Sequence, residues 1–238
     1  MIDLLDFESA RAGERYVAFL HTLRGLYERS FYRASHDVEA IGSIAKDGAA
    51  FAENFVEAEV RRLDETLDQA KAQGIARIRQ TIEGSQGAPL PDGEDYSEEL
   101  LVWFRRELAV QAFRDVNTLA FARRSHALQN ASAGRMRTFA VNKVGFLFTD
   151  RSGRKYPAQK FYRNLYRQTL LVFAVESAAA DAASFGYEEV YIDHADKNKA
   201  YMGVPITLTG NADMLSLHDV RDEVFHPNAT AFLTVQQS

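Results

Sequence analysis

The sequence predicts an α+β protein, with a long helical N-terminal half (a helical hairpin or bundle) followed by a small α+β module of short antiparallel strands packed on one helix. Apolar residues recur every three to five positions through most of residues 1–134, which is the period of a helix. After Gly134, β-branched and aromatic residues alternate with turn signals, as in strands. We therefore expect two domains, a helical arm or bundle over 1–134 and an α+β module over 135–238.

Three long helices are expected in the first half. The first runs from about residue 8 to 33, and the second from about 49 to 83, a rod of about 50 Å at about 1.5 Å per residue. A break rich in Gly and Pro follows at 84–93. Ser97 then begins the third helix with Ser-Glu-Glu-Leu, and Asn130 to Gly134 ends it. The second and third helices are expected to pair as an antiparallel hairpin.

The second half is expected to combine short strands with one helix. Residues 139–148 favour extended structure, and Asp150-Arg151-Ser152-Gly153 is typical of a hairpin turn in which Gly supplies the positive φ. A helix should follow from Pro157 and end near Phe185, because Gly186 is placed to terminate it. Three further strands are expected at 190–192, 205–208 and 232–235.

Composition excludes several classes of protein. The chain has no cysteine, which excludes disulfides, thiolate catalysis and cysteine-ligated zinc. No stretch approaches the roughly 18 apolar residues of a membrane span, and the first six residues have neither the basic start nor the apolar block of a signal peptide. No Gly-x-Ser-x-Gly motif or phosphate-binding glycine loop occurs. We expect no membrane contact, no catalytic residues, no metal and no cofactor.

Charge is unevenly distributed along the chain. Residues 1–122 carry 14 basic and 22 acidic side chains, residues 123–167 carry 11 and one, and residues 168–238 carry 3 and 10. The basic segment is either a solvated surface, a docking surface for an acidic protein, or a contact for DNA phosphates. The candidate partner- or phosphate-binding residues are Arg135, Arg137, Lys143, Arg151, Arg154, Lys155, Lys160, Arg163 and Arg167. Nearby Tyr156, Phe161, Tyr162 and Tyr166 either stack on bases or form the buried face of a helix.

Four segments of the second half follow one another in a characteristic order. They are the turn at 149–156, the helix at 162–183 with Phe185-Gly186-Tyr187 after it, the segment from Ile192-Asp193-His194 to Tyr201-Met202-Gly203, and His226-Pro227-Asn228. This order, which covers about 40% of the chain, resembles the type-two minor capsid proteins of tailed phages and the Mu F-like head morphogenesis proteins.

The resemblance implies a structural protein of the virion head, present in few copies and joined to the portal vertex during assembly in the host cytoplasm. Its implied partners are the portal, the major capsid protein or both. Members of this family often carry cysteines that look capable of holding zinc, after the strand corresponding to 190–192 and after His-Pro-Asn. This chain has none of them, so packing and hydrogen bonds are expected to replace the metal, with His226, Pro227 and Asn228 as a structural turn.

Two other functions stay open. His194, His218 and His226, together with acidic residues of the second half, offer ligands for a metal-dependent phosphodiesterase or toxin-like hydrolase, although their spacing is irregular. A DNA-binding accessory protein of the phage head would instead use the basic segment for packaged DNA. The apolar stripes of the first two helices form either the core or contacts between copies, which makes a homo-oligomer a further alternative.

Overall fold

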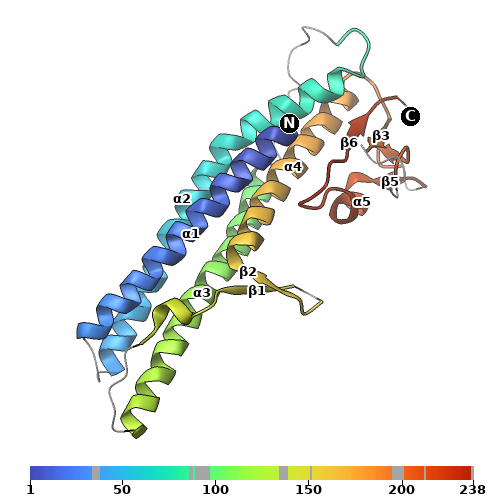
Figure 1. The fold of residues 1–238 in the computed structure, drawn as a ribbon. Coiled ribbons are helices and arrows are strands. Elements are labelled where there is room, and N and C mark those ends of the chain that lie inside the picture. The colour runs from blue at the N-terminus through green and yellow to red at the C-terminus, as the bar shows by residue number, and fades with distance from the viewer. Residues whose placement is uncertain are drawn as a thin grey trace. The chain divides into compact units, whose positions relative to one another are not determined.

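The computed structural model describes residues 1–33, 38–85, 88, 97–133, 139–150, 152–194, 201–211 and 213–236 (Figure 1). The protein is mostly helical, and its long helical part precedes a small module of short, mainly antiparallel strands, which confirms the predicted α+β class. The first part consists of α1 (Ile2–Arg33), α2 (Val38–Arg79) and α3 (Ser97–Ala133). The elements that follow are η1 (Val141–Lys143), β1 (Leu147–Thr149), β2 (Lys155–Pro157), α4 (Ala158–Ser184), β3 (Glu189–Asp193), β4 (Pro205–Thr207), β5 (Leu215–Ser216), α5 (Leu217–Val224) and β6 (Phe232–Thr234).

Most of the expected elements are present, and three differ from prediction. Residues 141–143 form a short 3-10 helix instead of a strand. Strand β5 and helix α5 were not predicted, although α5 begins with a capping box in which Ser216 and Asp219 each bond the other's backbone N–H. The expected helix stop is confirmed, because α4 ends at Ser184 and Gly186 adopts a φ of 84°.

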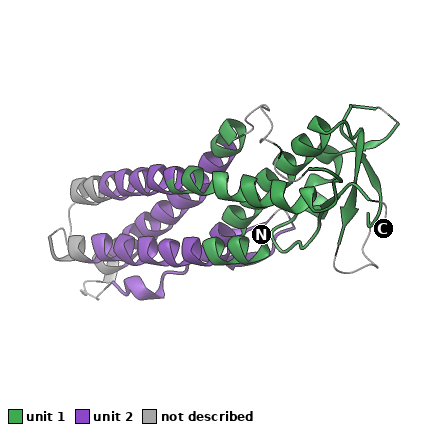
Figure 2. Ribbon diagram, turned by 90° about the horizontal axis from the view of Figure 1, so that it is seen from above, with its two compact units in different colours: residues 1–9, 62–102, 164–238 green, residues 10–61, 103–163 purple. Residues whose placement is uncertain are grey.

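The chain forms two compact units that are interleaved in sequence (Figure 2). Unit 1 comprises residues 1–9, 62–102 and 164–238, and unit 2 comprises residues 10–61 and 103–163. The sequence predicted a single boundary near residue 134. Each of the four long helices contributes to both units, and no Gly or Pro break marks the division in any of them.

Unit 2 is a helical bundle with an aromatic core. Phe19 of α1 stacks on Phe55 of α2 with ring centroids 4.4 Å apart, and Tyr16 lies 5.2 Å from Tyr162 at the start of α4. The expected antiparallel pairing of α2 with α3 is confirmed at two points. Glu57 pairs with Arg105 at 3.1 Å, and Gly48 lies beside Val116.

Unit 1 contains a four-stranded sheet in the order β5-β4-β3-β6, as far as the described residues show. Strand β3 pairs antiparallel with β4 and with β6, so that Val190 lies opposite Ile206 and Ile192 opposite Leu233. These four side chains are buried. The short β5 extends the sheet in parallel with β4.

Within unit 1, α2 and α4 run side by side in the same direction. Thr66 and Tyr166 approach to 3.3 Å between their hydroxyl oxygens, and the Arg79 guanidinium binds the Asp181 carboxylate at 2.6 and 2.8 Å. Between these points the two backbones meet at Gly74. A Cβ atom on Gly74 would lie 2.2 Å from the carbonyl oxygen of Ala174, so only glycine fits this crossing.

We predict that Gly74→Ala destabilises the protein by about 1–3 kcal/mol, because the new methyl group meets a helix backbone that cannot rotate away. Chemical denaturation would measure the change in the free energy of unfolding. Gly25→Ala is the matched control, since a Cβ at this position of α1 meets nothing within 4 Å. That variant should be unchanged or up to about 1 kcal/mol more stable, because Ala favours helix over Gly. Equal effects of the two substitutions would contradict this account of the crossing.

Candidate functional site

The turn between β1 and β2 is organised by one carboxylate. Asp150 accepts hydrogen bonds from the backbone N–H and the hydroxyl of Ser152 at 2.9 and 2.7 Å, from the backbone and Nε of Arg154, and from the Tyr156 hydroxyl. The hydrogen bond from the Ser152 side chain is the largest cause that lowers the pKa of Asp150, and together the donors bring it to about 2. Gly153 supplies the predicted positive φ, at 81°. The carboxylate is therefore ionised near neutral pH and fixes the tip of the hairpin.

The hairpin is anchored to the helices of unit 2 by aromatic and cationic contacts. Phe148 of β1 stacks on Phe161 of α4 at 4.1 Å, and the Arg114 guanidinium of α3 lies 6.0 Å from the Phe148 ring. Just before β1, Arg24 of α1 donates to the Val144 carbonyl at 2.9 Å and lies over the Phe146 ring at 4.7 Å. The hairpin is thus held on three sides.

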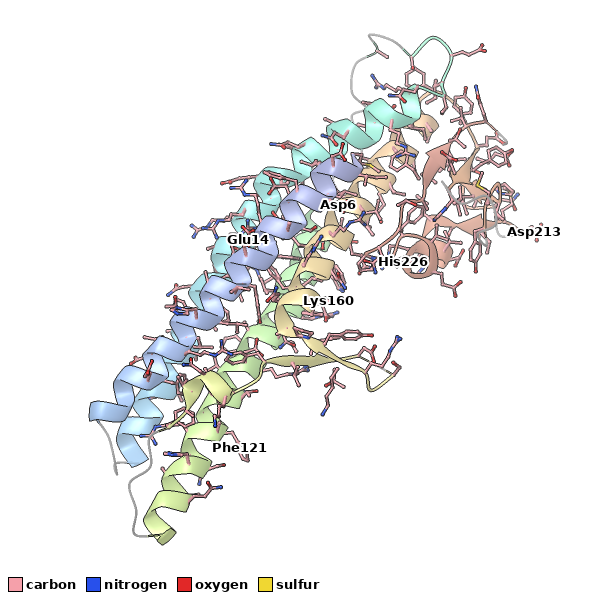
Figure 3. All side chains as sticks on the ribbon, viewed as in Figure 1. Asp6, Glu14, Phe121, Lys160, Asp213 and His226 are labelled. Atoms are coloured by element: carbon pink, nitrogen blue, oxygen red, sulfur yellow. The ribbon has the colours of Figure 1, made fainter. Side chains whose placement is uncertain are left out.

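Within the described part of residues 141–163, five cationic side chains are exposed, and we call them the basic hairpin surface: Lys143, Arg154, Lys155, Lys160 and Arg163. Arg154 forms an ion pair with Asp150 at 3.2 Å inside the turn. Lys160, labelled in Figure 3, lies 5.6 Å from the Tyr156 ring. Among the residues that the structure describes, no ion pair neutralises the other four cations of this surface.

Arg167 does not belong to this surface, contrary to the sequence prediction. Only 7% of it is exposed. Its Nε donates to Asp6 at 2.8 Å, and its terminal NH1 group donates to the carbonyl oxygens of Pro227 and Ala229 at 2.6 and 3.2 Å. The guanidinium therefore holds the chain around His226-Pro227-Asn228, where the His226 ring also accepts a hydrogen bond from the Asn228 backbone. The turn was expected from the sequence, whereas its contact with Arg167 was not.

The remaining predicted cations, Arg135, Arg137 and Arg151, lie outside the described residues. Of the aromatic residues proposed to stack on bases, Tyr162 and Tyr166 are fully buried and serve as the apolar face of α4. Tyr156 is bonded to Asp150, and Phe161 is bound in the stack with Phe148. The described part of the segment thus presents cations without a free aromatic platform for bases.

Among the described residues of unit 2, the carboxylates of Glu59 and Asp115 are buried, and neither was expected from the sequence. Asp115 of α3 accepts from the Tyr16 hydroxyl at 2.7 Å and from the Gln111 amide at 2.9 Å. Glu59 of α2 accepts from Arg15 Nε at 2.8 and 2.9 Å and from the Tyr162 hydroxyl at 2.5 Å. Both side chains are enclosed by the core, so their hydrogen bonds tie α1 to α3 and join α1, α2 and α4.

The histidines of the hydrolase alternative are not gathered into a site. His194 donates its backbone N–H to the Met202 sulfur, His218 is exposed on α5, and His226 belongs to the turn held by Arg167. Within the described residues, no group of three or more His, Asp or Glu side chains is arranged to hold a metal ion.

A hollow on the outer face of α3 was also not predicted. It is shallow and open to solvent, and it is lined by Val110, Phe113, Arg114, Asn117, Thr118 and Phe121. We call it the α3 hollow. Phe121 is 74% exposed, the largest exposure among the large apolar side chains of the described residues. Arg114 connects this hollow with the hairpin, because its guanidinium also contacts Phe148.

Comparison of the chain with protein-family models, with curated proteins and with solved structures found no match. None of the described helices is long and apolar enough to cross a membrane.

We predict that the stability of the protein falls by about 3 kcal/mol as Asp115 ionises. Burial raises the pKa of Asp115 from 3.8 to about 6, against the lowering effect of Tyr16, Gln111 and Arg114. A raised pKa in the folded state means that the stabilisation is complete below pH 4 and is lost as the pH rises through about 6. Urea unfolding at pH 4 and pH 7 would measure it.

The control is Asp115→Asn, which keeps an acceptor for the buried Tyr16 hydroxyl and cannot ionise. Relative to the wild type, this variant should gain about 3 kcal/mol of stability between pH 4 and pH 7. Parallel pH profiles of the two proteins would show that Asp115 does not titrate in this range.

Proposed function

We propose that the chain is a structural protein of a tailed-phage head, an assembly component that docks to the portal or the major capsid protein through the basic hairpin surface. The observation that carries this proposal is the rigid hairpin, which presents exposed cations with few internal partners. Such a surface binds carboxylates or phosphates and makes no covalent bond. The order of segments that resembles minor capsid proteins supports the choice of partner.

Catalysis is not part of this proposal. The buried carboxylates Glu59 and Asp115 are bonded to core tyrosines, and the three histidines lie on separate elements or turns. We therefore assign the chain a role in binding, in the virion head and, during assembly, in the host cytoplasm.

The test is a triple charge reversal, Lys155→Glu, Lys160→Glu and Arg163→Glu. We expect about tenfold fewer copies per particle, the effect of about 1.4 kcal/mol of lost binding free energy. Mass spectrometry of purified particles, quantified against the major capsid protein, would measure it. Because exposed charges contribute little to stability, the variant should stay folded by circular dichroism.

The matched control reverses three exposed cations elsewhere in unit 2, Arg11→Glu, Lys46→Glu and Arg61→Glu, which changes the net charge by the same amount. This control should be incorporated normally. Equal incorporation of both triple variants would refute the assignment of the surface, and absence of the wild-type chain from particles would refute the function itself.

A DNA-binding accessory protein is the second candidate, favoured by the same exposed cations. It predicts that the logarithm of the affinity for duplex DNA falls with the logarithm of salt concentration with a slope of about −0.9 for each phosphate neutralised. Gel-shift titrations at several salt concentrations would give the slope. The triple reversal at the hairpin should make it about three units less steep. Absence of a shift at low salt would exclude this candidate.

A further inference from the structure

Helix α3 carries a second regular face in addition to the one that it buries in unit 2. Its inward residues include Phe104, Leu108, Ala112, Val116 and Leu119, all buried. Its outward residues follow one another at intervals of three or four: Arg106, Val110, Phe113, Asn117, Phe121, Arg124 and Leu128. Such intervals place side chains along one side of a helix, here over about 33 Å at about 1.5 Å per residue.

Four members of this outer face are large apolar side chains left in solvent. Val110 is 53% exposed, Phe113 36%, Phe121 74% and Leu128 63%. The first three line the α3 hollow, and Figure 3 shows Phe121 projecting from α3. A single exposed apolar residue is ordinary, but a row of them around a hollow is typical of a binding surface. The helical spacing favours another helix as the occupant, because side-chain rows of this period pack into the grooves of a partner helix.

The outer face of α3 is positively charged, which favours partner helices that carry acidic residues. Arg106 and Arg124 lie in the row itself, and Arg114 lines the hollow, whereas none of the row's seven positions is acidic. Arg106 contacts Glu107 at 3.1 Å, a pair that is exposed and therefore weak. A second copy of α3 would bring arginines against arginines, which opposes a symmetric contact between copies.

We propose that the outer face of α3 binds an amphipathic helix of a partner protein, with the apolar side of that helix in the α3 hollow and acidic residues along its edges opposite Arg106, Arg114 and Arg124. The Asn117 amide and the Thr118 hydroxyl, which also line the hollow, offer further polar contacts. The inference rests on the proposed function in one respect, namely that the chain acts by binding proteins.

The test uses the full-length chain and two synthetic peptide probes of about 22 residues, which match the row in length at about 1.5 Å per residue. Both peptides carry Leu at every third or fourth position. One has Glu beside the Leu row, and the other has Lys at the same positions. Fluorescence anisotropy would measure the binding of each labelled peptide. We expect the Glu peptide to bind about tenfold more tightly than the Lys peptide, or better.

The double variant Val110→Ser, Phe121→Ser should weaken binding of the Glu peptide by about tenfold or more, because it removes apolar contact from the hollow. The matched control is Val17→Ser, at an apolar residue of α1 that is 44% exposed, and it should bind like the wild type. Binding that is equal for the two peptides, absent for both, or unaffected by the double variant would overturn the inference. A wild-type dimer that the double variant converts to monomer in sedimentation experiments would also overturn it, in favour of contact between copies.

Failure of this inference and failure of the proposed function are distinguishable. Peptide binding requires only the purified chain, whereas the proposed function depends on incorporation into particles. A chain that is absent from particles but binds the Glu peptide would keep the helix-binding site and lose the phage assignment. A chain that is present in particles but binds neither peptide would keep the phage assignment and lose the helix-binding site.

Discussion

The rest of unit 2 depends on burying two carboxylates between four helices. Glu59 and Asp115 are acceptable in an apolar core only because Arg15, Tyr16, Gln111 and Tyr162 donate hydrogen bonds to them. Each donor comes from a defined position on its helix, so the polar contacts fix the rotation and sliding of the helices more sharply than apolar packing alone. The hairpin on the outside of the bundle is held in place by the same helices, because it is attached to α1, α3 and α4.

Elements that depend on local signals were predictable from the sequence. The Asp150 to Gly153 turn and the helix end before Gly186 follow from residues adjacent in the chain, and both are confirmed. Contacts between distant residues were not predictable. Arg167 resembled every other arginine of the basic segment, yet its partners Asp6 and Pro227 lie 161 and 60 residues away. Arg123 is buried too, with 1% exposure, so a count of charges overstates the cations at the surface.

The outer face of α3 was missed for a different reason. A helix with one apolar stripe shows its period clearly, whereas α3 has apolar residues on opposite sides. The buried residues, such as Leu108 and Val116, are enough to predict the helix. Val110 and Phe121 add apolar residues to the sequence pattern without indicating a second face. Only the exposure of each residue in the folded protein separates the two sets. A sequence pattern of this kind therefore predicts a helix but hides its second surface.

The two candidate surfaces of unit 2 use cations differently. On the basic hairpin surface, exposed charges on η1, the β1–β2 hairpin and the start of α4 would bind by long-range attraction that salt screens. On α3, charges border apolar side chains, so burial of Val110, Phe113 and Phe121 on binding would supply free energy that salt does not screen. The arginines would favour a partner whose charges are negative. Arg114 belongs to both environments, because it lines the α3 hollow and contacts Phe148 of the hairpin. A partner helix seated in the hollow would thus lie against a side chain that already contacts the anchor of the hairpin, which places the two binding events within direct electrostatic reach of each other.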